Sequence, residues 1–315
     1  MKKWLLYLFI LCSASASSQD TAAGVDGEPG KNIDYKKRRW VIGGLTTAGY
    51  GGSFTFLSQA WYKEHPRTSF HTFNDAGEWN QIDKAGHAWT TYHTSRLTTN
   101  MWRWAGIKDD KAILYGTGSS LLFMLSIEYL DGHSADWGWS WADVGANIFG
   151  AALYAGQELG WKAQKLSIKF SSHYKNYKEQ DLKRRADDLY GASFQGRLLK
   201  DYNAQTYWLS ANIKSFFPET TLPAWLNMSV GYGADGMFGG YENIAKSKTD
   251  GAVTFDRRDI KRYRQYYFAP DVDFTKIKTR SKLLQSVFSA LNVLKFPAPA
   301  VEFSNGRFKV KALAY

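Results

Sequence analysis

Polar residues inside apolar, helix-like runs are the feature that most constrains how this chain folds. Three such runs follow one another, and their polar residues are Asp83-Lys84-Ala85-Gly86-His87, then Glu128, then Asp143 and Asn147. A charged or amide group costs free energy in an apolar interior unless another group pairs with it. We therefore expect the three runs to pack together with these polar residues in contact.

The spacing of the polar residues predicts three helices, over about residues 83–104, 107–130 and 140–158. Asp83 and His87 are four residues apart, as are Asp143 and Asn147, so each pair lies on one helix face. Ser140 is a typical N-cap for the third helix. We expect Asp143 and Asn147 to belong to a structural polar network, because an amide in an apolar helix needs several partners.

The candidate site residues have three interpretations. In the first, the buried polar groups form a non-catalytic network that fixes helix packing. In the second, His87 is an acid-base group that Asp83 orients, and Glu128 or Asp131 supplies a second carboxylate. In the third, His87, Glu128 and Asp131 bind a divalent metal such as zinc or manganese. We favour the first, because no Gly-x-Ser-x-Gly, His-Glu-x-x-His or phosphate-loop motif occurs and no cofactor is indicated.

The amino terminus predicts export. A charged start, a short apolar core and small residues follow one another over residues 1–19, as in a cleaved secretory signal. Cys12 follows the bulky Leu11, so we expect cleavage rather than lipid modification. Cleavage removes the single cysteine, which excludes disulfides and thiol chemistry from the mature chain. We expect the periplasmic side of the envelope, with the outer membrane as a possible site of association and the inner membrane as the alternative.

Charge and aromatic content favour a membrane or an anionic envelope lipid or glycan as partner. The formal charge of +11 falls by two, to +9, when Lys2 and Lys3 are removed, and the chain holds 13 Trp, 19 Tyr and 19 Phe. Basic and aromatic side chains suit anionic headgroups at a membrane surface. No nucleic-acid motif occurs, so we exclude that class of partner. Protein partners are not indicated.

Residues 40–62 form an apolar run that is long enough to span a bilayer at about 1.5 Å per residue. Its basic flank, residues 36–39, lies outside the cytoplasm after export, which opposes the positive-inside tendency. A helix packed on others or lying at a membrane surface is the alternative. The mean hydropathy of −0.41 argues against a polytopic membrane protein.

The hydrophobic period changes in the second half of the chain. Alternating and aromatic residues predict strands, and these lie at residues 206–213, 225–232, 263–274 and 301–315. Residues 281–294 have the spacing of a short amphipathic helix. The last stretch resembles the terminal strand of an outer-membrane barrel, but few strands precede it for a barrel of roughly eight. An antiparallel sheet packed on the helical half is the alternative.

These patterns predict an α+β fold, with an N-terminal bundle of about four helices followed by a C-terminal antiparallel β-rich region. The expected parts are a signal peptide (1–19), a linker (20–39), a helical domain (40–161), a basic connecting segment (162–204) and the β-rich region (205–315).

Two family resemblances involve the polar residues. Asp83-Lys84-Ala85-Gly86-His87, Glu128, and Asp143 with Ala146-Asn147-Ile148-Phe149-Gly150 resemble the YfiM-type domain of unknown function, which consists of predicted periplasmic lipoproteins. The same order of residues is similar to VanZ-like membrane proteins, a family linked to glycopeptide resistance. Residues 70–75, 92–93 and 205–208 resemble the longer members from Bacteroidetes-type bacteria. The resemblance covers about residues 40–240 and implies an envelope location rather than a particular reaction.

Overall fold

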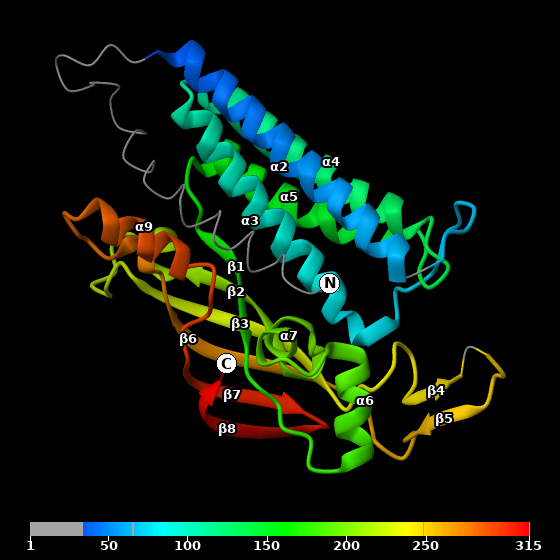
Figure 1. The fold of residues 1–315 in the computed structure, drawn as a ribbon. Coiled ribbons are helices and arrows are strands. Elements are labelled where there is room, and N and C mark those ends of the chain that lie inside the picture. The colour runs from blue at the N-terminus through cyan, green and yellow to red at the C-terminus, as the bar shows by residue number, and fades with distance from the viewer. Residues whose placement is uncertain (1–33, 65, 248, 315) are drawn as a thin grey trace.

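The computed structural model describes residues 34–64, 66–247 and 249–314. Helices make up the first part, residues 35–161, and an antiparallel sheet dominates the second part (Figure 1). The predicted α+β architecture is therefore confirmed. The predicted signal peptide, residues 1–19, lies outside the described residues.

Four long helices form the first part, and their bounds are α2 (Tyr35–Glu64), α3 (Ile82–Trp104), α4 (Asp109–Asp131) and α5 (Trp141–Trp161). Glycines allow α3 to approach its neighbours closely. A Cβ at Gly150 of α5 would lie 2.2 Å from the carbonyl oxygen of Ala88, and one at Gly116 of α4 would lie 2.4 Å from the backbone nitrogen of Thr99. Side chains at these two positions would push α5 and α4 away from α3.

The sheet has six antiparallel strands in the order β1-β2-β3-β6-β7-β8. Their bounds are β1 (Leu166–Ser172), β2 (Gln205–Asn212), β3 (Leu226–Asp235), β6 (Tyr263–Val272), β7 (Ala298–Ser304) and β8 (Arg307–Ala314). A separate hairpin pairs β4 (Ile244–Lys246) with β5 (Val253–Asp256). The shorter helices are α6 (Gln180–Tyr190), α7 (Phe194–Lys200), α8 (Ile213–Phe216) and α9 (Lys282–Leu291).

The sheet is strongly curved. Trp208 of β2 packs in one cluster with small residues of three other strands, Ala269, Ala300 and Ala314. On the same concave side, the ammonium of Lys169 lies 2.9 Å from Asp271, and both side chains are fully buried. Polar and small side chains therefore line the inside of the curve.

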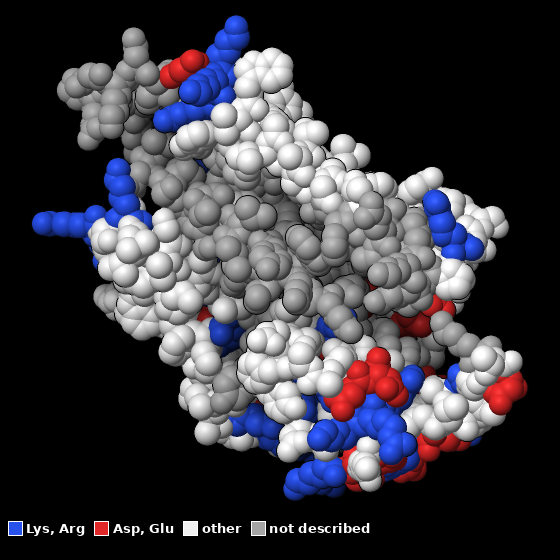
Figure 2. Space-filling view, in the orientation of Figure 1, with Lys and Arg blue, Asp and Glu red and all other residues white. Residues whose placement is uncertain are grey.

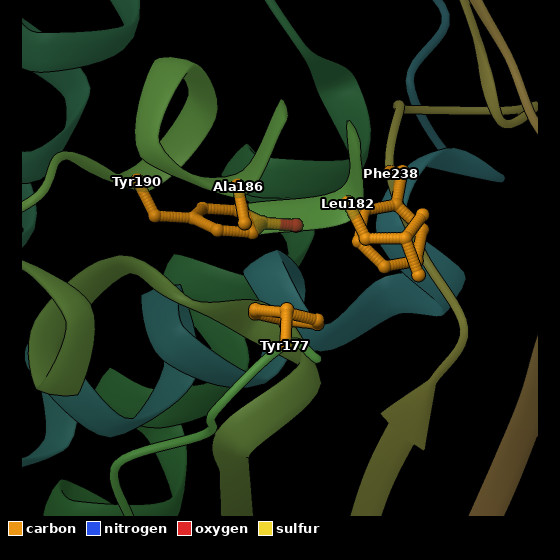
Figure 3. Close-up of a cluster of buried hydrophobic side chains, with 5 residues drawn as sticks. All are labelled: Tyr177, Leu182, Ala186, Tyr190 and Phe238. Atoms are coloured by element: carbon orange, nitrogen blue, oxygen red, sulfur yellow. The ribbon is translucent and has the colours of Figure 1, made fainter. Parts of the chain in front are cut away.

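The segment expected to connect the two halves, residues 162–204, contains β1, α6 and α7. Four of its residues form a small hydrophobic cluster with Phe238 (Figure 3). The members of this cluster are Tyr177, Leu182, Ala186, Tyr190 and Phe238. Of the basic residues in this segment, Lys183 and Arg184 lie on the exposed side of α6, because its apolar residues face this cluster, whereas Arg185 donates to the carbonyl oxygen of Phe238 at 3.0 Å.

Helix α3 lies between the other helices and the sheet. Its His93 ring nitrogen Nε2 lies 2.7 Å from the carbonyl oxygen of Ile168 in β1. The Tyr92 hydroxyl donates to the carbonyl oxygen of Leu166, at 3.1 Å. Hydrogen bonds from one helix thus join the bundle to the edge of the sheet.

The outer side of the bundle is poor in charge. Figure 2 shows basic side chains at the end where α2 begins and an uncharged surface along the adjoining part of the bundle. By length and composition, α4 is apolar enough to cross a membrane, a property that core helices of soluble proteins share.

Candidate functional site

Three helices and one loop bring seven polar side chains together in what we call the polar cluster. Its members are Asp75, Asp83, Lys84, His87, Glu128, Asp143 and Asn147. The first turns of α3 supply three of them, α4 supplies one near its end, and α5 supplies two near its start. Because α3 runs antiparallel to α4 and parallel to α5, the start of α3, the end of α4 and the start of α5 meet at one level of the bundle (Figure 1).

Lys84 links three segments of the chain. Its ammonium Nζ lies 2.5 Å from Asp75 in the loop before α3, 2.8 Å from Asp143 in α5 and 3.3 Å from Asp83 beside it. Burial alone would lower the pKa of Lys84, but the charges of Asp83 and Asp143 outweigh it and raise that pKa above its usual range. Lys84 therefore stays charged and holds the carboxylates together.

Asp75 and Ser140 fix the start of α5. The Ser140 hydroxyl donates to Asp75, and the same oxygen accepts the backbone N–H of Asp143 at 3.0 Å, so the predicted N-cap is confirmed. Burial raises the pKa of Asp143 to about 6. Burial also acts to raise the pKa of Asp75, but hydrogen bonds with Asp143, Lys84 and Ser140 outweigh it and lower that pKa.

His87 lies at the centre of the cluster. Its Nδ1 is 3.3 Å from Asn147 Oδ1 and 3.4 Å from Glu128 Oε1. Its Nε2 is 3.8 Å from Asp143 and 3.9 Å from Asp83, the residue one turn earlier. Burial acts to lower the pKa of His87, but the three carboxylates raise it above its usual value. The structure therefore brings together both residue pairs that the sequence placed four apart.

Glu128 is the most buried carboxylate of the cluster, with 1% of its surface exposed. Burial raises its pKa to about 8, against the effect of His87 and with a contribution from the charge of Asp143. The carboxyl is therefore mainly protonated at neutral pH. Asp131, the other carboxylate considered for this position, ends α4 and acts on the cluster by raising the pKa of Glu128.

Three members of the cluster have the composition of a metal site. Ligand atoms of Asp83, His87 and Asp143 lie within 4.8 Å of one another, which fits an ion bound by oxygen and imidazole. The ammonium of Lys84 already lies 2.8 Å from Asp143 and 3.3 Å from Asp83. A metal ion would therefore compete with a fixed positive charge.

Residues of the sheet half also reach the cluster. The Tyr202 hydroxyl, just before β2, donates to Asp83 at 2.9 Å. The Tyr207 hydroxyl of β2 lies 2.9 Å from where a Cβ of Gly86 would stand. Residues 79–81, which lead into α3, adopt positive φ angles, and the Tyr232 hydroxyl of β3 donates to the carbonyl of Asn80 in this turn. The sheet thus fixes the point where α3 begins.

Sequence reasoning missed three contributors: Asp75, Tyr202 and the bridging role of Lys84. Lys84 lies in the run Asp83-Lys84-Ala85-Gly86-His87, but the sequence indicated no role for it. Helical spacing alone does not show which neighbours a long side chain reaches. Asp75 and Tyr202 come from a loop and a short turn, where no periodicity indicates direction. A lysine among buried carboxylates is the signal that suggests such a bridge.

An open cavity of about 300 Å³ lies elsewhere, in the concave side of the sheet. Its lining includes His173, Asp235, Tyr263, Glu302 and Lys311 and contains no member of the polar cluster. The cluster and the cavity are therefore separate features.

Residues 72–156 match the model of a family described as predicted periplasmic lipoprotein (DUF2279). This segment resembles predicted periplasmic lipoproteins. The DUF2279 segment is shorter than the stretch of about residues 40–240 expected from the sequence, yet it contains every member of the polar cluster. The family match supports an exported location on the envelope side of the membrane. The similarity to VanZ-like proteins and to longer Bacteroidetes-type members stays a prediction. No curated protein and no solved structure gives a significant match.

Proposed function

We propose that this chain is a membrane-associated protein of the cell envelope with an architectural role, in which the polar cluster locks α3, α5 and the sheet half together. The observation that carries the proposal is the position of Lys84, whose ammonium contacts carboxylates of three segments, Asp75, Asp83 and Asp143. The DUF2279 match supports the envelope location. The outer membrane is the membrane we favour, with the inner membrane as the alternative.

The pairing within the cluster supports an architectural role. Lys84 forms ion pairs with Asp75, Asp83 and Asp143, and Asn147 Oδ1 accepts from the Thr91 hydroxyl at 2.8 Å while it faces His87. Buried ion pairs add little net stability over apolar packing, but breaking one leaves an uncompensated charge and is costly. Such a network therefore fixes how helices pack more than how strongly they pack.

An enzyme acting on an envelope lipid or glycan is the second candidate. The observation in its favour is that the pKa of Glu128 is about 8 and that of His87 is raised, with 3.4 Å between Glu128 Oε1 and His87 Nδ1. Two adjacent titratable groups with raised pKa values suit general acid-base catalysis. In the enzymatic role, Asp83 orients the His87 ring, because it lies one helical turn earlier with its carboxylate 3.9 Å from Nε2.

Replacing Lys84 tests the architectural role. We expect Lys84→Met to lower the free energy of unfolding by about 3 kcal/mol, because it leaves buried carboxylates without their cation. The control is Lys162→Met, which removes an exposed pair with Asp110 at 3.1 Å and should cost less than about 1 kcal/mol. Chemical denaturation measures both. Equal effects of the two variants would contradict the proposal.

The same measurements on His87→Ala, together with complementation of a strain that lacks the protein, separate the two candidates. In the architectural role, stability and complementation fall together. In the enzymatic role, His87→Ala keeps its stability and loses complementation.

A further inference from the structure

We propose that the outer layer of the bundle, formed by α2, α4 and α5, seats the protein on the surface of a lipid bilayer. This inference rests on the membrane association proposed above and names the surface responsible for it. The occupant of the surface is lipid, and the sheet half stays in water.

Helix α5 carries the most apolar part of this layer. Trp141 is 68% exposed, Phe149 55% and Leu159 51%. Along residues 144–161 the only ionisable side chain other than tyrosine is Glu158, which is buried and paired with Arg103. The outward side of this helix therefore presents large apolar side chains and small residues to its surroundings.

Helices α4 and α2 continue the surface on the same side of α3. Leu114 and Leu122 of α4 are 67% and 69% exposed, and Trp40 and Leu45 of α2 are 76% and 56% exposed. No ionisable side chain other than tyrosine lies between Lys111 and Glu128 in α4. Single exposed leucines are ordinary, but contiguous apolar faces on three neighbouring helices indicate a surface that is covered in use.

The ends of the helices have the residues expected at a membrane–water boundary. At one end, Arg38 and Arg39 donate to backbone carbonyls at the end of α3, and the Arg38 guanidinium lies 4.4 Å from the Trp104 ring centroid. At the other end, the exposed rings of Phe70, Tyr129 and Trp141 pack with the half-buried ring of Trp139. Aromatic rings prefer the interface, and basic side chains bind anionic headgroups. This combination favours lipid over a second copy of the chain as the occupant.

The position of the sheet determines how the layer meets the membrane. The sheet packs against α3 through Tyr92 and His93, and the end of α5 reaches the same edge strand, where Gln157 donates to the Leu166 carbonyl at 3.0 Å (Figure 1). A bilayer that surrounded the helices would therefore also surround the sheet, with its buried ion pair of Lys169 and Asp271. Helices lying along the surface, with their outer sides in the headgroup and acyl boundary, avoid this cost.

Flotation of the full chain with vesicles of phosphatidylethanolamine and phosphatidylglycerol tests the proposal. We expect the unaltered protein to float and Leu122→Glu and Phe149→Glu to reduce the bound fraction about tenfold, because each places a charge against lipid. The matched control is Val310→Glu on β8, where the side chain is 83% exposed in the sheet half. Binding of this control should stay within about twofold of the parent.

The outcomes distinguish the surface from the proposed membrane association. If the unaltered protein does not float, both are overturned. If the unaltered protein floats and the bundle variants float equally well, only the assignment of the lipid-binding surface is overturned. That assignment is also overturned if light scattering shows that the bundle variants change only the oligomeric state. As a second readout, a polarity-sensitive dye on Leu122→Cys should shift to the blue on vesicles, while the dye on Val310→Cys should not; equal shifts would also overturn the surface.

Discussion

At the scale of single residues, Glu128 makes stability depend on pH. Its pKa is about 8 because burial disfavours the charge, whereas an exposed glutamate titrates near 4.5. Between these values the folded protein binds a proton that the unfolded chain has released, so stability falls as pH rises. From pH 7 to pH 9 we expect a loss of about 1 kcal/mol from this group.

Glu128→Gln isolates this effect, because the amide keeps the shape of the side chain without titrating. Thermal unfolding of the parent and the variant at pH 7 and pH 9 measures the difference. His87 also has a raised pKa and loses its proton as pH rises, so the variant should retain part of the decline. An identical decline in both proteins would mean that Glu128 is ionised throughout.

The residues of the polar cluster were predictable to different degrees. Glu128, Asp83 and His87 stand in helical runs, so helical periodicity indicated their direction and their mutual approach. Asp75 joins them from a loop, and Tyr202 joins from the turn before β2. Their directions depend on how the loop and the sheet pack against α3, which is tertiary information that spacing along the chain does not contain.

At the scale of elements, two glycines of α5 predict opposite effects of the same substitution. Gly150→Ala should cost about 2 kcal/mol or more, because its Cβ would lie 2.2 Å from the carbonyl oxygen of Ala88, a backbone atom that moves only with the helix. Gly145→Ala should stabilise by a few tenths to about 1 kcal/mol, since a Cβ there meets nothing within 4 Å and alanine favours a helix. Chemical denaturation compares the two, and a neutral Gly150→Ala would contradict the close packing of α3 and α5.

The boundaries of the elements show what periodicity misses. The run at residues 301–315 alternates throughout and was expected as one strand, but Asn305 and Gly306 both have positive φ and turn the chain between β7 and β8. Asn-Gly is a typical two-residue hairpin turn, so this boundary was readable from sequence. The left-handed turn at residues 79–81 was not, because contacts such as that of the Tyr232 hydroxyl stabilise it from the sheet.

At the scale of the whole molecule, α3 is the element that both halves share. On one side it contributes the polar cluster, and on the other it hydrogen-bonds to β1 through Tyr92 and His93. These contacts of α3 explain why the helical half and the sheet half, which are separate along the sequence, pack into one structure. The same helix also carries two histidines whose pKa values are shifted in opposite directions, since that of His87 is raised and that of His93 is lowered.

His93 should make the joint between the halves sensitive to acid. Burial lowers its pKa to about 3, so the ring stays neutral and Nε2–H donates to the Ile168 carbonyl. Below about pH 6.5 the unfolded chain binds a proton that folded His93 does not, so its contribution to stability is present above that pH and is lost as pH falls. Between pH 7 and pH 5 we expect the parent to lose about 2 kcal/mol more than His93→Gln.

Chemical denaturation at the two pH values measures this loss, and hydrogen exchange shows where it acts. Because the ring joins α3 to β1, acid should speed exchange of backbone amides in both elements of the parent at the same time. In His93→Gln this acid-induced change should be smaller in both. Faster exchange confined to one of the two elements would mean that the helical bundle and the sheet open independently, which would contradict the role of α3 as their common support.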